Sequence, residues 1–141
     1  MKKTICMVAM VALSGCGSTT GPEVDLEGAF VTTPIEVTLQ YGEDRVVAGT
    51  VLRMSFAAVL GDSRCPSDVV CVWEGNAEVE IGIGAGMGPT SALQLNTALA
   101  PRSVEWNEVL VTLLEVTPYP VSDVPIADAA YSVKLRLEPV S

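Results

Sequence analysis

Apolar and polar residues alternate in short segments along most of the chain after residue 33. The alternation is strict over residues 35–39, 77–83 and 131–137. Because successive side chains of a strand point to opposite faces of a sheet, each of these segments predicts a half-buried strand. The same pattern directs Glu78 and Glu80 toward solvent.

Three further segments predict strands from less regular patterns. Residues 92–96 predict a short strand, and residues 109–116, which are apolar on both faces, predict a central one. Residues 50–60 predict a longer strand. Its predicted apolar side consists of Leu52, Met54, Phe56 and Ala58.

Turn-forming residues separate these segments. Residues 41–44 predict a turn, and residues 84–89, which are rich in glycine, predict a mobile connection. Pro118, Pro120 and Pro125 predict a loop between the last two strands. About seven or eight short strands follow from this pattern, with no long helical stretch after the N-terminal segment. We therefore predict an all-β fold, an antiparallel β-sandwich that is either Ig-like or a small barrel, over residues 34–141.

The N-terminal segment has a different pattern. Lys2 and Lys3 precede an apolar run over residues 4–13, about half of the roughly 20 residues that a membrane-spanning helix needs. A charged stretch followed by a short apolar run is typical of a signal peptide. An ordinary signal with a chance cysteine, or a buried N-terminal helix, is the alternative interpretation.

The sequence Leu13-Ser14-Gly15-Cys16 resembles the bacterial lipobox. The resemblance implies cleavage before Cys16 and the attachment of two or three acyl chains to Cys16. These acyl chains would hold the protein permanently at a membrane. Gly17, in place of Asp, implies the outer membrane if the host has two membranes. We therefore expect a signal peptide over residues 1–15, and a lipidated N-terminus with a flexible tether over residues 16–33.

Charge and composition exclude several function classes. The chain has 8 Lys and Arg against 17 Asp and Glu, and no His. This negative charge disfavours binding to nucleic acid and to anionic lipid head groups, so membrane association would depend on the lipid on Cys16. Without His, acid–base chemistry would fall to carboxylates. We expect no cofactor and no enzymatic activity.

The chain has four cysteines, two of which lie in the domain. Cys6 would leave with the signal and Cys16 would be lipidated, so Cys65 and Cys71 are expected to form a disulfide outside the cytoplasm, in a loop stiffened by Pro66. A metal site and a redox pair are the alternatives. A zinc site usually needs four Cys, His or carboxylate ligands, and this chain has no His. Redox pairs usually have Cys-x-x-Cys spacing.

A local motif surrounds the two cysteines. It begins with Asp62, Ser63 and Arg64 and ends with Trp73 and Gly75. Arg64 is expected to form an ion pair with a nearby carboxylate, of Asp62, Asp68 or Glu74. If Cys71 and Trp73 share one face of a strand, Trp73 would cover the disulfide. Gly75 would permit a bulge or a tight bend before the next strand.

This motif, Asp-Ser-Arg-Cys-Pro followed by Cys-x-Trp-x-Gly, resembles that of a group of small, uncharacterised bacterial lipoproteins and secreted proteins. Residues 95–97 and 116–120 are also similar to stretches in that group, and the resemblance extends over residues 35–137. It implies a β domain clamped by a disulfide. Since no activity is assigned to the group, the resemblance implies no catalytic residue.

Three functional hypotheses follow. The first is a binding or structural module of the cell envelope, which includes an inhibitor of an envelope enzyme, because stapled loops on a sandwich are suited to recognition. The second is a calcium-binding domain with Asp62, Ser63 and Asp68 as oxygen ligands. The third is a carboxylate-dependent enzyme. Its candidate residues are Asp62, Glu74, Glu78 and Glu80.

Trp106 is a further candidate for an exposed contact. The alternative is a core tryptophan at the start of a strand.

Overall fold

The computed structural model describes residues 31–140, which form eight β-strands and one short 3-10 helix. The first four strands are β1 (Ile35–Gln40), β2 (Asp44–Val46), β3 (Leu52–Asp62) and β4 (Ala77–Ala85). They are followed by β5 (Thr90–Asn96), β6 (Ser103–Trp106), β7 (Val109–Thr117), η1 (Asp128–Ala130) and β8 (Ser132–Pro139).

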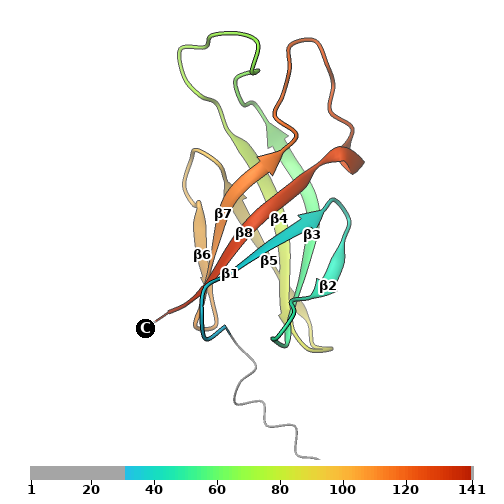
Figure 1. The fold of residues 1–141 in the computed structure, drawn as a ribbon, viewed down its shortest axis with the longest axis vertical. Coiled ribbons are helices and arrows are strands. Elements are labelled where there is room, and N and C mark those ends of the chain that lie inside the picture. The colour runs from blue at the N-terminus through green and yellow to red at the C-terminus, as the bar shows by residue number, and fades with distance from the viewer. Residues whose placement is uncertain (1–30, 141) are drawn as a thin grey trace, which may run out of the picture.

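The strands form two antiparallel four-stranded sheets. One has the order β1-β8-β7-β6 and the other the order β2-β3-β4-β5. Figure 1 shows the two sheets packed face to face. The prediction of an all-β antiparallel sandwich of about seven or eight strands is therefore confirmed, as is the interior position of β7 within its sheet.

Strict alternation places one face of each strand in the core. In β8, Val133, Leu135 and Leu137 are completely buried, whereas Lys134 and Arg136 lie on the outer face and pair with Glu36. Leu39 and Val37 of β1 and Ile81 and Val79 of β4 occupy the same core. Glu78 and Glu80 lie on the outer side of β4, half-exposed, as the pattern predicts.

Two segments depart from the predicted pattern. In β3 the pairing with β4 shifts between Phe56 and Ala58, so Ala58 leaves the apolar side and Val59 packs against the core instead. A β-bulge inserts a residue and reverses the alternation beyond it, and this explains the difference. The connection over residues 84–89 is also shorter than predicted, because Gly84 pairs with Thr90 within the ladder of β4 and β5.

The ends of the described chain lie away from the longest loops. Val31 is buried in the core, slightly ahead of the expected domain boundary at residue 34. Ile35, which begins β1, lies at one end of the sandwich (Figure 1). The opposite end carries three connections, residues 63–76, 97–102 and 118–131, which we call the loop end.

Candidate functional site

Arg64 joins the two longest loops of the loop end. It lies in the connection between β3 and β4, and its guanidinium group is almost completely buried. Nε and Nη2 donate to the two carboxylate oxygens of Asp62, at 2.8 and 2.6 Å. Nη1 donates to the carbonyl of Val116, and Nη2 also donates to that of Pro118 at 2.9 Å. The predicted ion pair of Arg64 is therefore confirmed, and Asp62 is its partner.

Asp62 has a second partner from a distant part of the chain. The hydroxyl of Tyr131 donates to its Oδ2 at 2.9 Å. Burial by itself would raise the pKa of Asp62, but hydrogen bonds from Arg64 and Tyr131 outweigh burial and hold this pKa below its ordinary value. Burial, together with the neighbouring Asp62 carboxylate, raises the pKa of Tyr131 to about 12. Asp62 thus carries its charge, and Tyr131 its proton, at neutral pH.

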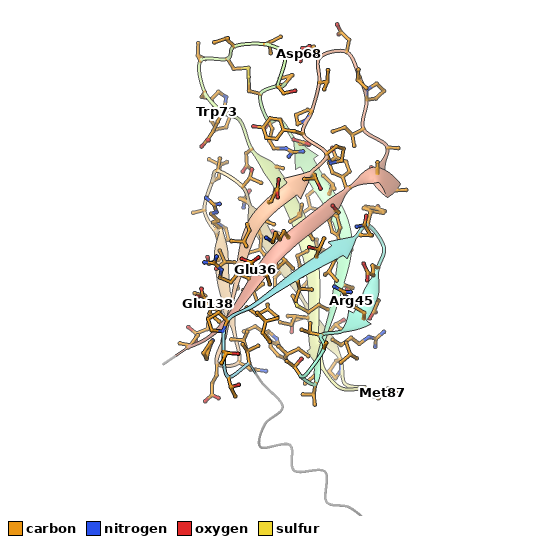
Figure 2. All side chains as sticks on the ribbon, in the orientation of Figure 1. Glu36, Arg45, Asp68, Trp73, Met87 and Glu138 are labelled. Carbon is orange, nitrogen blue, oxygen red and sulfur yellow. A yellow bond between two sulfur atoms is a disulfide. The ribbon has the colours of Figure 1, made fainter. Side chains whose placement is uncertain are left out.

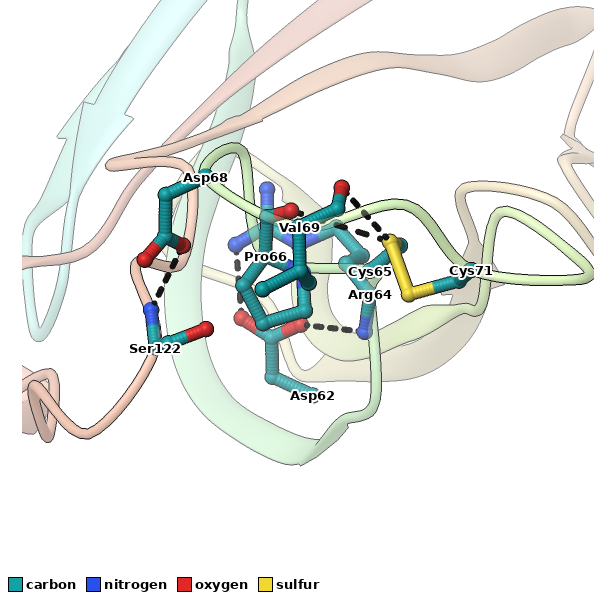
Figure 3. Close-up of a disulfide and its surroundings, with 8 residues drawn as sticks. All are labelled: Asp62, Arg64, Cys65, Pro66, Asp68, Val69, Cys71 and Ser122. Atoms are coloured by element: carbon teal, nitrogen blue, oxygen red, sulfur yellow. Dashed lines mark hydrogen bonds and ion pairs between the residues drawn. A yellow bond between two sulfur atoms is a disulfide. The ribbon is translucent and has the colours of Figure 1, made fainter.

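Cys65 and Cys71 form the predicted disulfide, with their Cα atoms 5.9 Å apart. Figure 3 shows the closed ring beside Pro66, with Arg64 and Asp62 at its base. The disulfide closes a short loop and lowers the conformational entropy of the unfolded chain, which stabilises the fold by about 2 kcal/mol.

The expected strand around Cys71 and Trp73 does not form. Residues 71–74 lie outside the strands, and the Trp73 residue is 54% exposed. The prediction that Trp73 covers the disulfide from a shared strand face is therefore wrong. Cys65 N–H donates to the carbonyl of Glu74, at 2.8 Å, so these residues form the base of a protruding loop instead.

Gly75 makes the tight bend that the sequence predicts before β4. Its φ is +74°, and a Cβ atom at this position would lie 2.0 Å from the carbonyl oxygen of Ser63. Only glycine accepts both the positive φ and this close approach. The approach allows Ser63 N–H to donate to the carbonyl of Asn76 at 2.7 Å.

Two buried amides that sequence reasoning missed hold the third loop in place. The side-chain nitrogen of Asn76 donates to Oδ1 of Asn96 at 2.7 Å. Oδ1 of Asn76 accepts the backbone N–H of Ala98 at 3.0 Å and of Leu99 at 3.3 Å. The available signal was the occurrence of asparagine directly beside apolar core residues of the strands, where an amide needs a partner.

Hydrogen bonds also connect the tips of the two long loops. Ser67 N–H donates to the carbonyl of Pro120, and the backbone N–H of Ser122 donates to Oδ1 of Asp68 at 2.8 Å. The second of these bonds is drawn in Figure 3. The Arg64 contacts and these bonds join the two loops to each other, and the disulfide closes the first of them.

Many of the exposed apolar side chains lie at the loop end. Among the described residues, eight of the twelve exposed large hydrophobic side chains belong to the loop end. They are Val69, Val70, Val72, Trp73, Leu99, Tyr119, Val121 and Val124. Figure 2 shows Trp73 at this end and Met87 at the opposite one. Single exposed hydrophobic residues are common on protein surfaces, whereas here most of those in the described part of the chain lie at one end of the sandwich.

A cavity of about 160 Å³ lies at the loop end, and one of the exposed apolar residues, Tyr119, borders it. The residues that line it include Arg64, Glu74, Glu115 and Tyr119. The Arg64 guanidinium lies 4.9 Å from the centroid of the Tyr119 ring. Within residues 31–140, the Glu74 and Glu115 carboxylates take part in no hydrogen bond or ion pair.

The other candidate residues do not converge. In the described part of the chain, no group of three or more Asp, Glu, Cys or His side chains is placed to hold a metal ion. Asp62 is bound by Arg64, and Asp68 by Ser122, so the expected calcium ligands face different partners. Glu78 and Glu80 lie on the outer side of β4, and neither of them borders the cavity.

Trp106 lies at the end of β6 rather than at a strand start. It is half-buried against the core, and its indole nitrogen donates to Oγ of Ser91 at 3.2 Å. This bond joins β6 to β5 of the other sheet, which indicates a structural role.

Comparisons of the chain with protein-family models, with curated proteins and with solved structures gave no match. Of the residues that the structure describes, none form a helix long and apolar enough to cross a membrane. The predicted signal peptide, the lipidation site Cys16 and most of the predicted tether lie outside the described residues.

Proposed function

We propose that this chain is a lipid-anchored envelope protein that binds another envelope protein through its loop end. One observation carries the proposal. Val70 and Val72 are fully exposed, at 101% and 104%, on a loop that a disulfide and a buried ion pair hold in one conformation. Exposed apolar residues are unfavourable in water, and a binding partner that covers them recovers this free energy.

The rigidity of the loops favours tight binding. A flexible loop loses conformational entropy when it docks, whereas one already held in its bound shape loses little. Complete burial of an apolar side chain such as valine stabilises a complex by roughly 1.5–3 kcal/mol. The four exposed apolar residues of the stapled loop, Val69, Val70, Val72 and Trp73, can therefore offset part of the free energy that association costs, and a small cost of ordering leaves more of their contribution for binding.

The direction of the loops supports the same proposal. The start of β1 lies at the end of the sandwich opposite the loop end (Figure 1). If Cys16 is acylated, the tether therefore joins the domain at the end opposite the apolar loops. The attachment point then leaves the loop end free to contact proteins of the envelope.

Capture from envelope extract tests the binding surface. The chain is immobilised as wild type, as the double variant Val70→Ser/Val72→Ser and as the control Met87→Ser, which removes an equally exposed side chain at the other end. We expect one envelope protein to be retained by wild type and by the control, and lost with the double variant. A set of retained proteins that is identical for all three would contradict the proposal.

Metabolic labelling tests the anchor independently. We expect labelled palmitate to enter the wild-type chain but not Cys16→Ser, and the variant to be released from the membrane fraction. Label-free wild-type protein that still carries Met1 would contradict the lipid anchor, without bearing on the binding surface.

A further inference from the structure

We propose that the partner inserts a basic side chain, of lysine or arginine, into the cavity at the loop end. This inference rests on the proposed function, since it names the chemistry of the partner that the apolar loops would contact. The cavity adjoins these loops, because Glu74 follows Trp73 in the chain and Tyr119 is itself one of the exposed residues.

The size of the cavity selects the kind of ligand. Sites for small molecules usually occupy about 300–1,000 Å³. At about 160 Å³, this cavity is too small for a metabolite of ordinary size but large enough for the end of one long side chain. Protein interfaces commonly use such pockets to hold a single anchoring residue.

The wall of the cavity favours a cation with an apolar stem. Ala98 and Leu114 border the cavity and offer apolar surface for methylene groups. Glu74 and Glu115 supply two carboxylates that no hydrogen bond or ion pair engages within residues 31–140. Tyr119 also borders the cavity, and the centroid of its ring lies 4.9 Å from the Arg64 guanidinium.

Arg64 does not make the cavity an anion site. Asp62 neutralises its charge through two hydrogen bonds, and the carbonyls of Val116 and Pro118 occupy further N–H groups. An anion in the cavity would thus find few free N–H donors and would be repelled by two carboxylates. A cation would be attracted by these carboxylates.

The surroundings extend this charge preference to the partner's surface. The three connections of the loop end contain two basic residues, Arg64, which is already paired, and Arg102. They contain four acidic residues: Asp68, Glu74, Asp123 and Asp128. Complementary charge steers association and selects partners. The partner's contact surface should therefore be apolar at its centre and basic around it.

Two small probes test the cavity directly. Butylguanidinium and butylurea have nearly the same shape, but only the first carries a charge. The isotope-labelled protein is purified in the form that the cell produces. Each probe is titrated into it, and the backbone amide signals of Gly75 and Ala98 are followed by NMR. We expect saturable shifts with butylguanidinium and binding of butylurea at least about five-fold weaker.

Neutral variants identify the source of the preference. The double variant Glu74→Gln/Glu115→Gln should bring the two probes to within about two-fold of each other, because the carboxylates are exposed charges that can be removed without unfolding. Glu138→Gln, on the outer side of β8, is the matched control and should leave the preference unchanged. Equal binding of both probes to wild type, or a preference that survives the double variant, would overturn the inference.

The capture assay separates this inference from the proposed function. If Val70→Ser/Val72→Ser loses the partner but Glu74→Gln/Glu115→Gln retains it fully, the loop surface stands and the basic side chain is refuted. If the probes bind as expected but no envelope protein depends on Val70 and Val72, the cavity stands and the proposed function fails.

Discussion

Replacement of Arg64 by methionine should remove most of the contacts that join the loops of the loop end, and so should lower the free energy of unfolding. Methionine keeps a similar length but removes the charge and all the N–H donors. Asp62, whose side chain is only 10% exposed, would keep its charge with Tyr131 as its remaining side-chain donor. The carbonyls of Val116 and Pro118 would also lose their donor.

The expected magnitude follows from burial. Removal of one partner from a buried ion pair costs about 3–5 kcal/mol, because the other charge is left without compensation. A domain of this size has a total free energy of unfolding of about 5–15 kcal/mol. Arg64→Met should therefore lose at least about 3 kcal/mol, a large fraction of the total.

The chain offers a matched control for this measurement. Lys134 and Glu36 lie at the same N–O distance as Arg64 and Asp62, 2.6 Å, but their side chains are 43% and 44% exposed. Lys134→Met should cost less than about 1 kcal/mol, the usual value for an exposed pair.

Urea unfolding at pH 7 measures both variants, with Asp62→Asn and Arg64→Met/Asp62→Asn to complete a double-mutant cycle. We expect the double variant to be more stable than the sum of the single effects by at least about 2 kcal/mol, since it leaves no buried charge. Equal small losses for Arg64→Met and Lys134→Met would refute the reasoning.

Three further predictions concern the same loops. Cys65→Ser/Cys71→Ser should lower the free energy of unfolding by about 2 kcal/mol and weaken capture of the partner, as urea unfolding and the capture assay would show; unchanged capture would argue against a preorganised loop. Gly75→Ala should cost at least about 2 kcal/mol by the same unfolding assay, because the added Cβ meets the Ser63 carbonyl at a positive φ; a change below about 0.5 kcal/mol would mean that the bend relaxes easily. Stability should also depend on pH at both extremes. The contribution of Asp62 is complete above its unfolded pKa of 3.8 and is lost as the pH falls through its lower folded value, whereas that of Tyr131 is complete below about pH 10 and is lost toward pH 12. Tyr131→Phe should remove the alkaline loss seen in pH-dependent melting, and persistence of that loss would assign it to another group.

Alternation sufficed to predict most of the sandwich, because burial on one face of a strand imposes a period of two. Alternation gave no correct prediction where a strand has no buried face or where a bulge interrupts the period. β2 consists of three exposed residues, Asp44–Val46, and so has no apolar side to recognise. The bulge after Phe56 reverses the faces of β3, and nothing in the local sequence marks the inserted residue.

The candidate site was only partly predictable for a similar reason. Asp62 and Arg64 are close in sequence, so their pairing could be expected. Val116, Pro118 and Tyr131 reach Arg64 and Asp62 from more than 50 positions along the chain, and this approach depends on how the two sheets pack. Trp73 was misplaced because the apolar and polar residues around Cys71 imitate a strand, although the disulfide and Gly75 make them a loop.

Site-specific photo-crosslinking in living cells tests the central claim most directly. A photoreactive residue is placed at Val72 and, in a separate strain, at Met87, two positions that are almost fully exposed at opposite ends of the sandwich. We predict that the residue at position 72 crosslinks to a single envelope protein with a basic contact surface, and that the residue at position 87 does not. Crosslinks to the same proteins from both positions, or none from position 72, would contradict the account.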